Sequence, residues 1–244
     1  VASQLRREVD PPAGRIQRLF NGVDLDRFQP ELDSPRRVAE GSRPLGLAPG
    51  QRCLAYVGQL TKEKGVEDIL AIQHTLIERH PDLVILWIGD GPLSAAVEKG
   101  VTDRIRYLGL RNDVERLLRH VDILVAPSRW HEAFCLTVAE GAACGVPAVA
   151  SSIGGISEVV DHGVSGLLVP PGDRDALLAS LESLLDDEAS RAGMAIAARR
   201  RAVGKFSLDD MVATTFEHYR RLGLPQPRES VFPLGSPSHL QVTP

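Results

Sequence analysis

Short apolar runs alternate with longer segments of helical periodicity between about residue 52 and residue 186. The runs are apolar throughout, which is typical of strands in a parallel sheet that is covered on both faces. The expected strands are 53–57, 83–88, 105–108, 123–126, 148–151 and 166–169. This alternation predicts an α/β fold, a Rossmann-like doubly wound parallel sheet of about six strands with helices on both faces.

Two of the segments between strands carry a clear apolar stripe. The first stripe consists of Val66, Ile69, Leu70, Gln73, Leu76 and Ile77 and is broken only by the glutamine; the second consists of Leu177, Leu178, Leu181, Leu184 and Leu185. Both follow the helical period. Two more helices are expected after the sheet, over about 188–203 and 208–222. Before the sheet, residues 15–20 followed by Asn21-Gly22 predict a strand that ends in a tight turn.

Composition and charge exclude several classes of protein. Hydrophobic residues make up 43% and charged residues 25% of the 244 residues, as in ordinary globular proteins. The formal net charge of −4 gives no general basic field that would attract nucleic acid. The three cysteines form an odd set without metal-ligand spacing, which favours reduced thiols in a cytoplasmic protein.

The ends of the chain carry their own signals. No apolar run approaches the roughly 20 residues that span a bilayer, and no signal peptide opens the chain. The sequence begins with Val1, and both methionines lie late, so we expect the native start to be missing. Five prolines fall within the last 22 residues, and we expect residues 223–244 to be a disordered tail.

In an open parallel sheet, ligands bind where the carboxyl ends of the strands enter loops. The search for a site therefore narrows to the loops 58–65, 89–94, 109–113, 127–135 and 152–157.

The first of these loops carries Gly58, Gln59 and Lys64. It matches neither a P-loop nor a Gly-x-Gly-x-x-Gly dinucleotide motif. A lysine beside a helix start could still bind a phosphate, because free N–H groups and the positive end of the helix dipole lie there. A solvated lysine in a turn is the equally weighted alternative.

The second and last loops favour structural turns. Gly89-Asp90-Gly91-Pro92 follows the second strand, where a turn is the first interpretation and a place in the cleft lining the second. The paired glycines Gly154-Gly155 also favour a turn. His131 is the only histidine in a candidate loop, and without a partner it is weak evidence for catalysis. Arg199–Arg201 most simply mark the solvated face of a helix.

The 127–135 loop carries the strongest signal. Glu132 lies in the loop, and Glu140 lies eight positions later in a helix that Gly145 and Pro147 end. With a helix start near Cys135 and about 1.5 Å of rise per residue, Glu140 falls roughly 7–8 Å along the helix. That span fits a nucleoside diphosphate at the helix start with its ribose near Glu140, and Glu132 beyond the β-phosphate. The alternative is two unrelated surface glutamates.

Taken in order, these motifs resemble the C-terminal domain of the family 4 retaining glycosyltransferases, the two-domain GT-B enzymes of glycosyl transferases group 1. The matching pieces, from about residue 16 to residue 222, are Asn21-Gly22-Val23-Asp24, Phe28-x-Pro30, Tyr56-Val57-Gly58-x-Leu60, Glu63-Lys64-Gly65, Ile88-Gly89-Asp90-Gly91-Pro92, Tyr107-Leu108-Gly109, Pro127-Ser128, Glu132-x7-Glu140, Gly145-Val146-Pro147-Ala148-Val149-Ala150, Gly154-Gly155-Ile156-x-Glu158 and Gly163-x-x-Gly166-Leu167-Leu168-Val169-Pro170-Pro171-Gly172-Asp173. Singly most are loose, but in this order and spacing they are highly specific.

The resemblance implies a role for each matching position. Lys64 would contact the donor diphosphate and stabilise the leaving nucleotide, Glu132 would contact hydroxyls of the donor sugar, and Glu140 would hold the ribose. Backbone amides of Phe134, Cys135, Leu136 and Thr137 would meet sugar and phosphate oxygens. Gly58 and Gln59, with Gly89 and Asp90, would line the donor cleft, and Gly109-Leu110 the base pocket. No metal or other cofactor is implied, because positive side chains and the helix end would balance the charge.

The chain departs from the family pattern at two positions. Gln59 stands where the family usually has an arginine, and Cys135 stands where it usually has a glycine.

The resemblance also implies a domain organisation. Residues 1–30 would lead in from a missing N-terminal GT-B domain, 31–206 would form the nucleotide-sugar-binding domain, 207–222 a crossover helix, and 223–244 the proline-rich tail. The expected partners are a UDP- or GDP-sugar donor and that missing domain, with peripheral membrane association through that domain left open and no nucleic acid.

Alternative functions remain open on the sequence alone. Gln59 and the absent partner domain would also suit a non-catalytic nucleotide-sugar-binding module. A GT-B-related epimerase is a further alternative, whereas a phosphorylase would need a lysine for pyridoxal phosphate in a context that the sequence lacks.

Overall fold

The centre of the molecule is a six-stranded parallel sheet. The computed structural model describes residues 17–30 and 45–223. The strands are β1 (Arg52–Val57), β2 (Leu83–Ile88), β3 (Ile105–Tyr107), β4 (Ile123–Ala126), β5 (Ala148–Ser151) and β6 (Gly166–Val169). Their order in the sheet is β3-β2-β1-β4-β5-β6. This confirms the predicted Rossmann-like fold, and the strand bounds differ from the expected ones only at the start of β1 and the end of β3.

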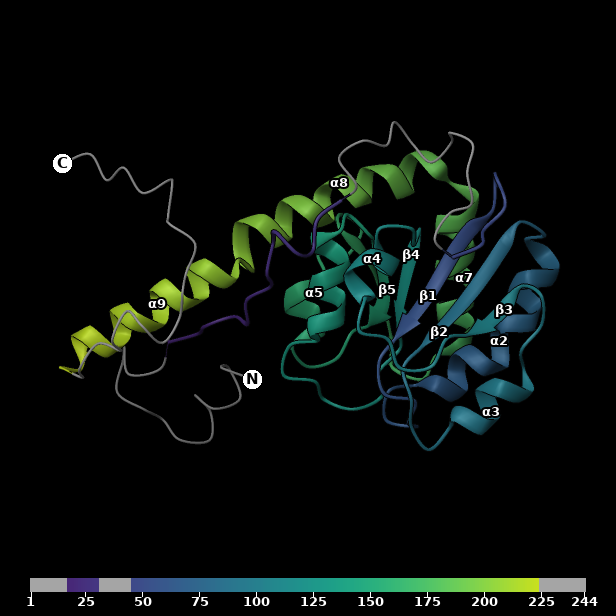
Figure 1. Cartoon of the computed structure of the whole chain (residues 1–244), viewed down its shortest axis with the longest axis horizontal. Coiled ribbons are helices and arrows are strands. Elements are labelled where there is room, and N and C mark those ends of the chain that lie inside the picture. The colour runs from purple at the N-terminus through teal and green to yellow at the C-terminus, as the bar shows by residue number, and fades with distance from the viewer. Residues whose placement is uncertain (1–16, 31–44, 224–244) are drawn as a thin grey trace.

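Helices cover both faces of the sheet (Figure 1). They are α2 (Val66–Arg79), α3 (Ser94–Lys99), α4 (Val114–Leu118), α5 (Leu136–Ala143), α6 (Ile156–Val159), α7 (Arg174–Asp186), α8 (Glu188–Lys205) and α9 (Leu208–Arg221). Buried side chains of α2, α3 and α7 share one core with alternate residues of the strands. Buried side chains of α4, α5, α6 and α8 share the other core on the opposite face.

The glutamine that breaks the first apolar stripe has a partner inside the core. Gln73 is buried in α2, and its Oε1 accepts a hydrogen bond from the indole Nε1–H of Trp87 on β2 at 3.0 Å. A buried indole N–H needs such an acceptor. Gln73 therefore belongs to the helix face that packs on the sheet.

The strand expected over 15–20 does not form. Residues 17–20 have no strand structure, and residues 15 and 16 lie outside the described part of the chain. This segment meets the junction of α8 and α9 rather than an edge of the sheet. Val23 N–H donates to Phe206 O at 2.7 Å, and Phe20 packs edge-on against Phe206 with ring centroids 5.4 Å apart. Phe20 of this segment thus packs in an aromatic cluster instead of a sheet. The β-type pairing nearby is an isolated bridge between Val23 and Ser207.

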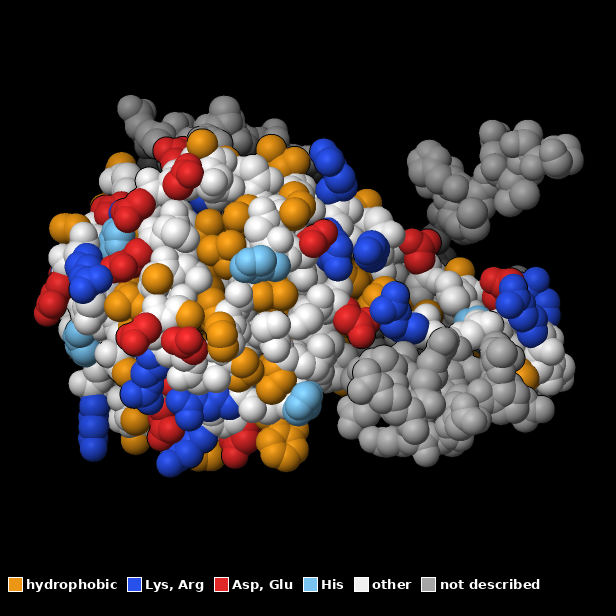
Figure 2. Space-filling model, turned by 180° about the vertical axis from the view of Figure 1, so that it is seen from behind, with side chains coloured by type: hydrophobic (Ala, Val, Ile, Leu, Met, Phe, Trp, Pro, Cys, Tyr) orange, Lys and Arg blue, Asp and Glu red, His pale blue; other side chains and the backbone are white. Residues whose placement is uncertain are grey.

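Helices α8 and α9 run along one side of the sheet and extend beyond it (Figure 1). α8 packs against α5, whereas α9 projects away and contains no buried residue. The predicted domain start at residue 31 and nearly all of the predicted tail 223–244 lie outside the described residues. Within the described ranges, no helix is long and apolar enough to cross a membrane. Acidic and basic side chains are interspersed on the face seen in Figure 2.

Candidate functional site

A cavity of about 340 Å³ opens at the carboxyl ends of β1 and β4. These neighbouring strands mark the switch point of the sheet, because the chain continues from β1 toward β3 on one side and from β4 toward β6 on the other. Crevices of open parallel sheets bind ligands at this point. The lining residues are Tyr56, Val57, Gly58, Gln59, Lys64, Val125, Ala126, Ser128, Glu132, Cys135, Leu136 and Thr137.

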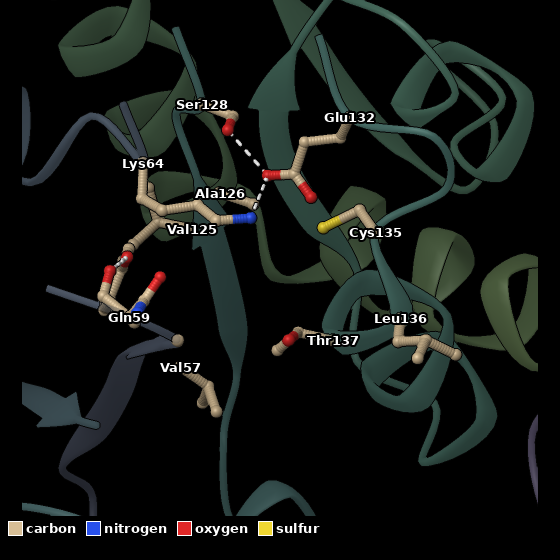
Figure 3. A pocket seen from close by; sticks show the side chains of 12 residues that line it. Val57, Gln59, Lys64, Val125, Ala126, Ser128, Glu132, Cys135, Leu136 and Thr137 are labelled. Carbon is tan, nitrogen blue, oxygen red and sulfur yellow. Dashed lines mark hydrogen bonds and ion pairs between the residues drawn. The ribbon is translucent and has the colours of Figure 1, made fainter. Parts of the chain in front are cut away.

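One carboxylate lies at the centre of the polar lining (Figure 3). Glu132 Oε1 lies 2.8 Å from Lys64 Nζ and accepts a hydrogen bond from Ser128 Oγ at 2.6 Å. The side chain of Glu132 is only 13% exposed, whereas that of Lys64 is 36% exposed. Both partners use the same oxygen, so Glu132 Oε2 keeps its capacity to accept hydrogen bonds from a ligand.

The two loops that carry Lys64 and Glu132 are in direct backbone contact. A Cβ added to Gly65 would lie 1.9 Å from Pro127 O, so only glycine permits this approach. Gly65 also has a positive φ of 73°, a conformation that favours glycine. Arg129 N–H donates to Glu63 O at 2.7 Å. The predicted motif pieces Glu63-Lys64-Gly65 and Pro127-Ser128 therefore meet across the switch point.

The loop after β5 supports Glu132 from the other side. Gly155 N–H donates to Glu132 O at 2.6 Å, and a Cβ on Gly154 would lie 2.4 Å from that same carbonyl oxygen. The two glycines thus serve the close approach of two loops, which agrees with their interpretation as a structural turn.

The start of α5 provides the second wall of the cavity. Leu136 and Thr137 open this helix, and both line the cavity together with Cys135 before them. The first backbone N–H groups of a helix have no partner within it, and the helix dipole makes this end positive. An anion in the cavity would therefore meet the α5 start on one side and Lys64 on the other. The first residues of α2, which the sequence offered as another anion-binding helix start, do not line the cavity.

Cys135 begins α5 in the left-handed conformation, with φ 74° and ψ 77°. Among the described residues it is the only non-glycine with a positive φ. Its sulfur faces the cavity beside Glu132 (Figure 3). Burial and then the Glu132 carboxylate raise the pKa of the thiol to about 12, so the thiol is neutral near pH 7.

Gln59 lines the cavity on the same side as Lys64 (Figure 3). Its backbone carbonyl accepts a hydrogen bond from the Tyr56 hydroxyl at 2.6 Å. Burial, followed by the Glu132 carboxylate, raises the pKa of Tyr56, so this hydroxyl stays protonated and fixes the turn that carries Gln59.

Glu140 lies on α5, one turn beyond Thr137, and does not line this cavity. Its side chain is half-buried, and burial raises its pKa, opposed by Arg27 and reinforced by Glu115. Glu140 is therefore a carboxylate held where its charge is disfavoured and only partly balanced.

Of the other predicted positions, Gly58 lines the cavity and the rest fall around it. Gly58, Gly89 and Gly109 lie in a row at the ends of neighbouring strands, because Gly58 N–H donates to Ile88 O and Gly89 N–H to Gly109 O. Asp90 accepts a hydrogen bond from Gly91 N–H at 2.7 Å and so caps its own turn. Leu110 is 78% exposed, and Phe134 is buried in the aromatic cluster with Phe206.

Several polar residues of the site were not singled out from the sequence. Ser128 appeared only as part of a motif. Its hydrogen bond to Glu132 joins residues four positions apart and depends on the turn between them. Arg129 and Asp68, which are joined just behind Glu132, are 61 positions apart in the chain. The position of Asp68 among core residues of α2 was the available signal. His131 is exposed and does not line the cavity. Over the described ranges, no three His, Cys, Asp or Glu side chains are grouped to hold a metal ion.

The family model and the related sequences that match this chain agree with each other. Residues 39–201 match the family model for glycosyl transferases group 1. The D-inositol 3-phosphate glycosyltransferase of Salinispora arenicola (strain CNS-205) is 33% identical over 232 residues, which cover 88% of this chain and 51% of that protein. The chain spans about half the length of the curated relatives it matches, 51–58% for the first three.

Solved structures share the fold. The crystal structure of Anabaena Alr3699/HepE in complex with UDP has a TM-score of 0.76 at 24% identity, covering 88% of this chain and 60% of that one. The C-terminal domain of the glycosyl transferase group 1 family protein LpcC from Francisella tularensis has a TM-score of 0.65 at 23% identity. The match covers 77% of this chain and 100% of that domain.

Proposed function

Because the chain belongs to the glycosyl transferases group 1 family, we propose that its cavity holds the diphosphate of a nucleotide-sugar donor during a metal-independent, retaining transfer. The observation that carries this proposal is the meeting of Lys64 and the α5 start in one cavity at the switch point of the sheet. A diphosphate needs positive charge and several hydrogen-bond donors, and these two features supply both.

Lys64 is the cation proposed for the leaving nucleotide. Its ammonium has three N–H donors, and Glu132 takes one of them. The remaining donors are available to a phosphate oxygen. When the bond between sugar and diphosphate breaks, negative charge grows on the diphosphate, and a fixed cation with a helix start lowers the energy of that state. This arrangement supports metal-independent chemistry.

Glu132 is proposed to bind the donor sugar. Its Oε1 is held by Ser128 and Lys64, and Oε2 is left to accept hydrogen bonds from sugar hydroxyls. A carboxylate fixed by two partners keeps its position when the ligand binds, which is the requirement for orienting a reacting sugar. Glu140, farther along α5, is proposed to accept hydrogen bonds from the ribose.

The complete transfer is proposed for a longer protein. The chain spans about half the length of its curated relatives, and a second domain would supply most of the contacts to the acceptor. UDP in the HepE structure favours a uridine nucleotide, with a guanosine nucleotide as the alternative. Three free cysteines support a reducing, cytoplasmic setting.

A non-catalytic nucleotide-sugar-binding module is the second candidate. Gln59 favours it, because a glutamine amide gives a phosphate only neutral hydrogen bonds where an arginine gives a charged fork. Transfer activity of the full-length protein, measured with a panel of acceptors, separates the two candidates.

The binding proposal is tested by titrating the chain with UDP and GDP in a calorimeter. Lys64→Ala should weaken binding at least about tenfold, as expected for a lost charge-assisted hydrogen bond. Lys62→Ala is the matched control, because Lys62 lies in the same loop, is 71% exposed and pairs with Glu67 instead. Equal affinities of the two variants, or no binding by the parent chain, would contradict the proposal.

A further inference from the structure

A buried carboxylate contacts the loop that carries Glu132 through Arg129 of that loop. Asp68, in the first turn of α2, has a side chain that is only 1% exposed. Two arginines bind it. Arg129 grips both carboxylate oxygens, with Nε 2.7 Å from Oδ2, and Arg174 at the start of α7 lies 2.8 Å from Oδ1. Burial alone would raise the pKa of Asp68, but the hydrogen bonds from Arg129 and Arg174 outweigh it and hold the pKa below its usual value.

Arg129 connects this buried charge to the candidate site. In the sequence it lies between Ser128 and Glu132, the two residues that share a hydrogen bond in the cavity. Its backbone N–H donates to Glu63 O, next to Lys64, while its side chain reaches Asp68 in the first turn of α2. One residue therefore ties the Glu132 loop both to the Lys64 loop and to the helix that follows it.

Stability alone does not account for such an arrangement. Arg129 is 41% exposed and Arg174 47% exposed, whereas Asp68 is buried. Such a pair contributes little net stability, because the cost of removing the carboxylate from water offsets most of its attraction to the arginines. A planar guanidinium that meets a carboxylate with two parallel hydrogen bonds does fix geometry, since it restricts both distance and orientation. The fork between Arg129 and Asp68 restricts the loop at a point three residues before Glu132.

We infer that Arg129 is a positioning residue, whose fork onto Asp68 holds Glu132 in place beside Lys64 and turned toward the donor sugar. This inference rests on the proposed function, because it assigns Glu132 to the sugar. The positioning role also predicts which part of the donor is bound less tightly when the fork is lost. Loss of the fork should weaken binding of the sugar part of a donor more than binding of the nucleotide, which α5 and Lys64 hold by themselves.

The chain offers a matched control for this test. Arg52 forms a similar fork with Asp82, at 2.5 and 2.6 Å, but at the amino ends of β1 and β2, the opposite edge of the sheet. Arg52→Gln and Arg129→Gln each break one two-pronged arginine–aspartate pair. Asp68 keeps Arg174 as a partner in the second variant, so no buried charge is left unpaired and the chain should fold.

The experiment compares the affinities of UDP and UDP-glucose, and of GDP and GDP-mannose, for the parent and the variants, with melting temperatures alongside. Arg129→Gln should lower the affinity for the better nucleotide sugar about five- to tenfold and leave that for its nucleoside diphosphate within about twofold. The affinity of Arg129→Lys for the nucleotide sugar should lie between those of the parent and Arg129→Gln, because lysine keeps the charge but not the two-pronged contact. Arg52→Gln should lower the melting temperature without changing the ratio of the two affinities.

Hydrogen exchange of the ligand-free chain gives a second, independent readout. Arg129→Gln should speed amide exchange in residues 127–135, and Arg52→Gln should not. If both variants change the ratio of the affinities for the nucleotide sugar and its nucleoside diphosphate, or if neither does, the positioning role is wrong. The proposal that the cavity binds a nucleotide would still stand. If the parent binds none of the four probes, the proposed function fails, and unchanged exchange in residues 127–135 would then overturn the positioning role as well.

Discussion

At the scale of single residues, Glu140 illustrates a conflict between stability and binding. Burial raises its pKa, so the folded chain binds a proton at Glu140 more tightly than the unfolded chain does. Stability therefore falls as the pH rises from the ordinary pKa through the raised one, and at neutral pH the carboxylate is destabilising. A ligand with hydroxyl donors would relieve that cost, which is a reason to expect ribose there.

Glu140→Gln should therefore act in two opposite directions. At pH 7 the variant should melt at a higher temperature than the parent, and the difference should vanish below the ordinary pKa of a glutamate. Binding of the nucleoside diphosphate should weaken by about 1.5–3 kcal/mol, the loss of a charge-assisted hydrogen bond. Calorimetry and thermal melts over a pH series check both effects. Unchanged affinity would exclude the ribose role.

Gln59 is the second residue at which binding can be changed in a defined direction. It lines the cavity near Lys64, so Gln59→Arg should add a charged fork toward the same anion. We expect a nucleoside diphosphate to bind about 1–2 kcal/mol more tightly. The gain should shrink with added salt and should be smaller for a nucleoside monophosphate. Equal affinities of parent and variant at low salt would place the diphosphate elsewhere.

Only some polar residues of the site could be predicted from the sequence. Lys64, Glu132 and Gln59 were found because they follow strand ends, and all three line one cavity. The pair of Asp68 and Arg129 was missed, because it joins residues that are far apart in the sequence and would each look ordinary on a surface. The left-handed backbone of Cys135 was also not predicted, although the glycine that the family usually has at this position was the available signal.

At the scale of elements, the start of α5 is the most informative part of the fold. The sequence predicted this helix to begin near Cys135, and it begins at Leu136. The strand bounds were predictable because the short apolar runs are clearly bounded by glycine, proline or polar residues. The expected strand over 15–20 failed because its partner is an aromatic cluster at the α8–α9 junction, and periodicity does not reveal tertiary partners.

Substitutions at Cys135 test the strain at this helix start. With φ 74°, a side chain at this position strains the backbone, and glycine does not. Cys135→Gly should therefore be more stable than Cys135→Ala by about 1 kcal/mol. At an ordinary backbone position the order would be reversed, because glycine loses more entropy on folding. Denaturant unfolding of the two variants gives the difference, and a more stable alanine variant would refute the strain.

At the scale of the whole molecule, binding of the nucleotide can be measured separately from transfer of the sugar. Under the proposed function the chain forms one half of a two-domain cleft. The purified chain should then bind nucleotide but transfer no sugar, because half a cleft cannot exclude water or position an acceptor. The α9 arm, which projects from the sheet without a buried residue, is consistent with a larger assembly. Radiolabelled-donor assays of the chain alone and of the longer protein check this. Robust turnover by the chain alone would contradict it.

A crystal structure of the chain with UDP or GDP shows whether a nucleoside diphosphate binds between Lys64 and the start of α5. We expect a phosphate oxygen within about 3 Å of Lys64 Nζ and another within the same distance of a backbone N–H at the start of α5. We expect the ribose hydroxyls beside Glu140. A nucleotide bound away from the ends of β1 and β4, or with its phosphates turned away from Lys64 and α5, would contradict this placement.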